Sequence, residues 1–234
     1  MEKHASSSVY WNVLAIILLA LSAHGDQFPA SFWMYTSRTF CSATAIGPRA
    51  ILLAAHCIES EERVTVTHSG QTIGGTCHRH PEYSPDRYQH DLALCVLTAP
   101  LQGVTFERVS LDAPPPKRTP LLVAGFGCKG HDQTRTLRVA SAAVDAVPDA
   151  HDDHLVLRGT TLCDGDSGGA TYVLGPPSSP VGRAIVGVNS TSRALQRSTA
   201  ASLGTDSARA FLRTWTASGV EVCGVTRGMH GCRP

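Results

Sequence analysis

The sequence lacks several features that mark particular classes of protein. It contains no run of five or more like charges, and its 20 Lys and Arg residues nearly balance its 19 Asp and Glu residues. Proteins that bind nucleic acid normally carry a strongly basic patch or domain, so we expect no nucleic-acid partner. No apolar run approaches the roughly 20 residues that a membrane-spanning helix needs. Because 42% of its 234 residues are hydrophobic, the chain is predicted to be globular.

The apolar run at the N-terminus is short. It reads VLAIILLALSA over residues 13–23, follows Lys3, and has the length of the hydrophobic region of a secretory signal. We therefore predict a signal peptide over residues 1–22, with cleavage after Ser22 or Gly25, since both sites have a small residue at position −3. A buried core helix and an uncleaved signal anchor are the alternatives. The prediction is a secreted, extracellular protein without a stable membrane anchor.

The cysteines point to the same compartment. There are eight of them and no CxxC pair, and an even count in an exported chain is most simply explained by four disulfides. A zinc site built from Cys77, His78, His80 and His90 is the competing hypothesis. The oxidising compartment and the missing CxxC pair disfavour it. We expect neither a metal nor a cofactor.

Short runs of β-forming residues separated by turn residues indicate an all-β fold. Four prolines between Leu111 and Pro120 predict an extended connector over residues 113–120. The connector divides a domain of residues 23–234 into an N-terminal half, about 26–112, and a C-terminal half, 121–234. One amphipathic helix is predicted near the end, after the candidate caps Asp206 and Ser207 and before Gly219. The β-type runs are AILLAAHC from Ala50, RVTVTH from Arg63, DLALCVL from Asp91, LLVAGFG from Leu121 and AIVGVNS from Ala184.

Three short segments carry side chains with a shared chemistry. They are LLAAHC, which contains His56, HDLALCVL, which contains Asp91, and CDGDSGGA, which contains Ser167. A serine hydroxyl becomes a nucleophile when a histidine takes its proton and a carboxylate orients that histidine. Glycines beside the serine allow a tight turn whose N–H groups stabilise an oxyanion. The three segments predict a catalytic triad of His56, Asp91 and Ser167.

These segments resemble the signature segments of the trypsin/chymotrypsin-like serine peptidases, and the resemblance extends from about Phe28 to Trp215. It implies an all-β fold of two six-stranded antiparallel barrels with the active site between them, followed by a C-terminal helix. It also implies a monomeric endopeptidase that cleaves protein or peptide substrates, with the N–H groups of Gly165 and Ser167 as the oxyanion hole. The disulfides that it implies are Cys41–Cys57, Cys77–Cys95, Cys128–Cys163 and Cys223–Cys232.

The resemblance also implies a specificity pocket. Its base would be Thr161, six positions before the nucleophile, where an aspartate would select Arg or Lys. A hydroxyl cannot neutralise a buried guanidinium, so cleavage after Arg or Lys is disfavoured and small or medium uncharged side chains are expected. The other residues expected to line the pocket are Leu162, Ser190, Thr191 and Ser192.

The sequence departs from the family at the point of activation. Relatives usually become active when cleavage frees an Ile-Val-Gly-Gly N-terminus, whose ammonium pairs with the aspartate before the serine, here Asp166. This chain has no such sequence, and no Lys or Arg between Lys3 and Arg38. Either signal peptidase supplies the ammonium, or another group holds Asp166, or the oxyanion hole collapses. In the last case the protein would be a catalytically silent homologue that binds a protein partner.

Overall fold

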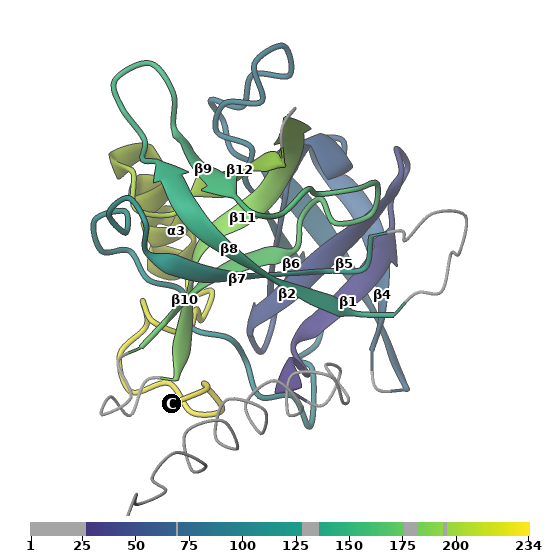
Figure 1. The fold of residues 1–234 in the computed structure, drawn as a ribbon. Coiled ribbons are helices and arrows are strands. Elements are labelled where there is room, and N and C mark those ends of the chain that lie inside the picture. Colours follow the sequence, from purple (N-terminus) through teal and green to yellow (C-terminus); the bar gives the residue numbers. More distant parts are fainter. Residues whose placement is uncertain (1–26, 69, 128–135, 176–181, 194–195) are drawn as a thin grey trace, which may run out of the picture.

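The computed structural model describes residues 27–68, 70–127, 136–175, 182–193 and 196–234. The proposed signal peptide therefore lies outside the described residues. Within these residues, twelve strands form two antiparallel systems, and one α-helix follows them (Figure 1). The predicted all-β fold of two six-stranded barrels with a C-terminal helix is confirmed.

The N-terminal barrel runs in the order β1-β2-β3-β6-β5-β4, and its edge strands β1 and β4 contact each other. Both faces of β2 and β3 are buried, and most of their side chains belong to the apolar core. The short helix η1 follows β3 directly and carries His56. The six strands are β1 (Ser31–Tyr35), β2 (Phe40–Gly47), β3 (Ala50–Leu53), β4 (Glu62–His68), β5 (Gln71–Arg79) and β6 (Ala93–Leu97), and η1 is Ala55–Cys57.

The C-terminal barrel is closed, in the order β10-β11-β12-β9-β8-β7, with β10 also paired to β7. Ser167 lies in the turn that leads into β10, whereas His56 lies in η1. Each half of the chain therefore contributes a residue to the proposed triad. A buried cluster of Leu, Val and Ala side chains fills this barrel. The six strands are β7 (Pro120–Gly125), β8 (Arg138–Ala146), β9 (His154–Arg158), β10 (Ala170–Leu174), β11 (Arg183–Arg193) and β12 (Arg197–Ser202).

The helix α3, Asp206–Ala217, follows the C-terminal barrel in the chain and contacts the N-terminal barrel, where Trp215 meets the ring of His78 in β5 and Phe211 meets the ring of His80. It buries the predicted apolar face through Phe211 and Leu212. The prediction of its N-cap was wrong, because the cap is Thr205, whose hydroxyl accepts a hydrogen bond from the N–H of Ala208 at 3.2 Å. Among the described helices, none is long and apolar enough to cross a membrane.

Three disulfides join described cysteines: Cys41–Cys57, Cys77–Cys95 and Cys223–Cys232. Two of them lie in the N-terminal barrel, where Cys77 and Cys95 face each other across β5 and β6. The third closes the C-terminal tail. The fourth expected pair involves Cys128, which lies outside the described residues.

Candidate active site

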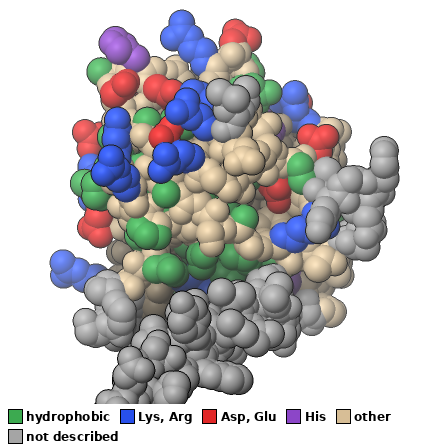
Figure 2. Space-filling model, in the orientation of Figure 1, with side chains coloured by type: hydrophobic (Ala, Val, Ile, Leu, Met, Phe, Trp, Pro, Cys, Tyr) green, Lys and Arg blue, Asp and Glu red, His purple; other side chains and the backbone are tan. Residues whose placement is uncertain are grey.

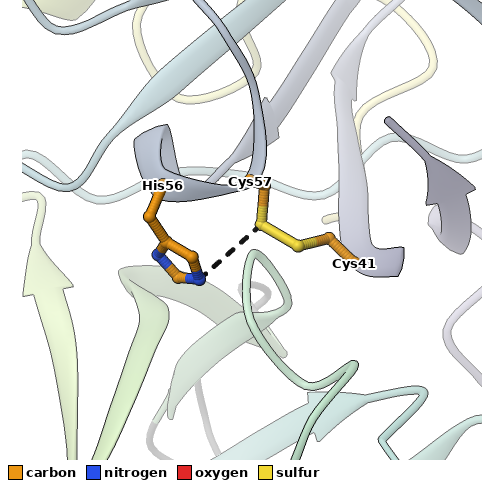
Figure 3. Close-up of side chains that lie close together, drawn as sticks. All are labelled: Cys41, His56 and Cys57. Atoms are coloured by element: carbon orange, nitrogen blue, oxygen red, sulfur yellow. Dashed lines mark hydrogen bonds between the residues drawn. A yellow bond between two sulfur atoms is a disulfide. The ribbon is translucent and has the colours of Figure 1, made fainter. Parts of the chain in front are cut away.

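The base and the carboxylate of the proposed triad come from the N-terminal barrel. The carboxylate of Asp91 is fully buried and accepts two hydrogen bonds from His56, one from its backbone N–H at 2.8 Å and one from Nδ1 at 2.7 Å. This geometry fixes the ring and leaves Nε2 as the nitrogen that can take a proton. Cys57, the residue after His56, is bonded to Cys41 in a disulfide. The Sγ atom of Cys57 lies 3.9 Å from Nε2 of His56 (Figure 3).

Two tyrosines lie near this pair. The ring of Tyr88 meets the imidazole of His56 edge-on, with 5.4 Å between ring centroids. Burial, and then the negative charge of Asp91, raise the pKa of Tyr83 to about 12. The phenol of Tyr83 therefore stays neutral at physiological pH, and it does not add a second negative charge beside Asp91.

Ser190 links the carboxylate to the nucleophile. Its hydroxyl donates to Asp91 Oδ2 at 2.5 Å, while its carbonyl oxygen accepts the hydroxyl of Ser167 at 3.2 Å. The side chain is buried, and its hydroxyl is directed toward the carboxylate of Asp91. Its place in the specificity pocket stays a prediction. Within the described chain, no hydrogen bond joins Ser167 to His56 directly. Such a bond often forms only once substrate is present.

The turn before Ser167 presents two backbone donors. It is closed by a bond from the N–H of Asp166 to the carbonyl oxygen of Cys163 at 2.9 Å, and Gly165 at its third position has φ +96°. Only glycine adopts that φ readily. No hydrogen bond between described residues uses the N–H of Gly165 or of Ser167. Both N–H groups therefore remain available to an oxyanion.

Asn189 holds the nucleophile segment against β7 and β10. Its buried amide donates to the carbonyl oxygens of Ala124 at 3.0 Å and Asp166 at 3.2 Å, and its Oδ1 accepts the hydroxyl of Thr171 at 2.8 Å. Its backbone also pairs with Gly168 and Gly169. A fully buried asparagine with these partners positions the turn before Ser167.

The expected specificity residues lie in two segments, one after β9 and one in β11, that both contact β12. Thr161 is exposed, and its neighbours Thr160 and Leu162 are both tied to Ser198, whose hydroxyl donates to the first at 3.1 Å and accepts from the second at 3.0 Å. The hydroxyls of Thr191 and Thr199 lie 2.7 Å apart, and Ser192 is exposed. Ser198 and Thr199 were not predicted, because nothing in the sequence places β12 beside these residues.

The residues of the alternative zinc site, Cys77, His78, His80 and His90, do not form one cluster of ligands. Cys77 is in a disulfide, and His78 pairs with Glu61. Among the described residues, His80, Glu82 and His90 instead lie close to one another. Both ring nitrogens of His80 already have protein partners, since Nδ1 accepts the N–H of Glu82 at 3.1 Å and Nε2 lies 3.2 Å from the hydroxyl of Ser207.

The model of the trypsin family matches residues 21–209, most of the chain. The chain therefore belongs to the trypsin family of serine endopeptidases, whose members act on protein or peptide substrates. It is 28% identical over 194 residues to coagulation factor XII of Sus scrofa, covering 65% of this chain and 31% of that protein. It is 29% identical over 173 residues to kallikrein-5 of Homo sapiens, covering 62% of this chain and 59% of that protein. The chain thus spans less than two thirds of either relative.

Proposed function

We propose that this chain is an active, secreted serine endopeptidase that cleaves peptide bonds through an acyl-enzyme on Ser167. The observation that carries the proposal is the bond of 2.7 Å between Nδ1 of His56 and the buried carboxylate of Asp91. A histidine fixed in this way is prepared to act as a general base toward a nearby hydroxyl. The available N–H groups of Gly165 and Ser167 support the same reaction.

The proposed reaction assigns each group one task. His56 takes the proton of Ser167 as the hydroxyl oxygen attacks the carbonyl carbon of the substrate, and Asp91 stabilises the resulting imidazolium. The N–H groups of Gly165 and Ser167 stabilise the oxyanion, and each such donor is worth about 2.7–4 kcal/mol in the transition state. His56 then returns the proton to the leaving amine. Water, activated by the same histidine, releases the acyl group.

A phosphonate directed at serine peptidases tests this proposal against the silent homologue. The active enzyme should be labelled stoichiometrically on Ser167, and the Ser167→Ala variant should not be labelled. A silent homologue that binds a partner through the same cleft would be labelled hardly at all. Peptide mapping of the labelled protein identifies the modified residue.

We further propose that the preferred residue before the cleaved bond is uncharged and of small or medium size. The resemblance implies Thr161 as the base of the pocket, and the hydroxyls of Ser198 and Thr191, which support the proposal, are neutral. A peptide library varied at that position tests the proposal. A dominant preference for Arg or Lys would contradict it, whereas Thr161→Asp should shift the preference toward those residues.

Secretion and the monomeric state are also proposals. Three disulfides are typical of an oxidising compartment, and the apolar run over residues 13–23 supports export. Acidic and basic side chains are interspersed on the face shown in Figure 2, which favours a peptide substrate over a nucleic acid. N-terminal sequencing of protein collected from the medium would test the cleavage site, and size-exclusion chromatography the monomer.

A further inference from the structure

The carboxylate of Asp166 is enclosed by backbone. Its Oδ1 accepts the N–H of Gly127 at 2.8 Å, and its Oδ2 accepts the N–H of Cys163 at 3.0 Å. Gly125 and Gly127 leave the space that it occupies, because a Cβ on either residue would lie 2.4 Å from an atom of the carboxyl group. Among the described residues, each carboxylate oxygen thus has one backbone donor.

The turn that Asp166 ends has the conformation that an open oxyanion hole needs. A four-residue turn with positive φ at its third residue is of type II, and flipping its central peptide would give a type I turn with negative φ there. Gly165 has φ +96°, so the turn is of type II. In a type I turn the N–H of Gly165 would point in the opposite direction. This conformation is compatible with the two available donors described above.

Ser42 fixes the same turn from the other barrel. This residue of β2 is buried, and its hydroxyl donates to the carbonyl oxygen of Gly165 at 2.6 Å and accepts the N–H of Phe126 at 2.8 Å. Its backbone N–H donates to the carbonyl oxygen of Ser167 at 2.8 Å. Ser42 therefore connects the turn from Cys163 to Asp166, the nucleophile Ser167 and the Gly-Phe-Gly segment that encloses Asp166.

We propose that Ser42 and the backbone cradle of Asp166 hold the oxyanion hole open from within the fold, so that this peptidase needs no activating N-terminal cleavage. The inference rests on the proposed function. Ser42 is then a positioning residue, because its hydroxyl binds the carbonyl oxygen of Gly165 and, being buried, does not touch the substrate. The inference also accounts for a chain that lacks an Ile-Val-Gly-Gly sequence.

The first experiment measures the hydroxyl of Ser42. Ser42→Ala should lower kcat about 10- to 100-fold, because the oxyanion donors lose their fixed direction, while KM changes little. Thr44→Val is the matched control: Thr44 lies two residues along the same strand, is equally buried, and its hydroxyl has no hydrogen-bond partner in the described chain. If both variants fold and lose activity equally, the role of Ser42 is wrong. Thermal unfolding of both variants separates folding from activity.

The second experiment varies the N-terminus. The secreted protein is compared with a form that carries an uncleaved Gly-Ser extension on its mature N-terminus. We expect equal kcat values and equal rates of phosphonate labelling. An N-terminal ammonium is required if the extension lowers kcat and the labelling rate at least tenfold and its removal restores both. That result would overturn the inference and leave the proposed function intact, whereas labelling of neither form would overturn both.

Discussion

The two barrels hold their parts of the active site by different means. The N-terminal barrel fixes His56 through the buried carboxylate of Asp91 and the disulfide Cys41–Cys57 beside it. The turn before Ser167 is held by backbone hydrogen bonds and by two buried polar side chains, Asn189 of the C-terminal barrel and Ser42 of the N-terminal barrel. A disulfide acts mainly by restricting the unfolded chain, whereas a buried polar network leaves unsatisfied groups when any member is removed.

The largest expected effect lies where the two barrels meet. His56→Ala and Ser167→Ala should each reduce kcat by about 10⁴- to 10⁶-fold, and the double variant should be no worse than either, because triad members act as a unit. Asp91→Asn should cost about 10⁴-fold. Steady-state kinetics on a peptide substrate measures these losses. Substantial hydrolysis by His56→Ala would show that the triad is wrongly assigned.

The next effect concerns a buried ion cluster at the start of β11. The carboxylate of Glu107 is fully buried and accepts hydrogen bonds from Arg183 at 2.5 Å and from Arg233 at 3.1 Å. Glu107→Gln leaves these guanidinium groups without a counter-charge and should lower the free energy of unfolding by about 3–5 kcal/mol. The exposed pair of Glu59 and Arg38 is the control, since Glu59→Gln should cost about 0–1 kcal/mol. Urea unfolding compares the two variants.

The disulfide Cys41–Cys57 should contribute a similar or smaller amount to the free energy of unfolding. Replacing Cys41 and Cys57 together by serine should lower stability by about 3 kcal/mol, because the bridge closes a loop of about 15 residues in the unfolded chain. The same double replacement of Cys223 and Cys232, which close a shorter loop, should cost somewhat less. Thermal unfolding measures both. If the tail bridge proves the more important, loop entropy does not explain the difference.

The smallest expected effect is on the pH dependence of stability. Burial lowers the pKa of His80, whose ring stacks on His90 and lies near Glu82 and Asp153. A histidine whose pKa is lower in the folded state binds its proton more readily when unfolded. Stability should therefore be greatest above the ordinary histidine pKa of about 6.5 and decline as the pH falls below it.

Measurement of Tm between pH 7.5 and pH 5 tests this expectation. His80→Gln should show a shallower decline than the natural chain. His151→Gln is the control, because His151 is exposed and its replacement should leave the slope unchanged. An equal decline in His80→Gln and the natural chain would assign the effect to other groups.

Short-range patterns in the sequence were sufficient for the general architecture. The β-type runs, the proline-rich connector and the apolar face of the last helix predicted an all-β chain in two halves with one helix near the end, because each pattern depends on neighbours within a few residues. The two six-stranded barrels were implied by the resemblance to the trypsin/chymotrypsin-like peptidases. The N-cap was the exception. Asp206, Ser207 and Thr205 are all residue types that favour that position, so the sequence alone could not choose between them.

What the sequence by itself determined was which residues are available for chemistry: His56, Asp91 and Ser167 stand in motifs whose residue types suggest their roles. The tertiary structure decided their supports. Only the fold places the hydroxyl of Ser190 on Asp91 and that of Ser42 on the turn of Gly165, across separations of 99 and 123 residues. A serine can donate in many directions, and its partner is set by the packing of the two barrels, which no local pattern encodes.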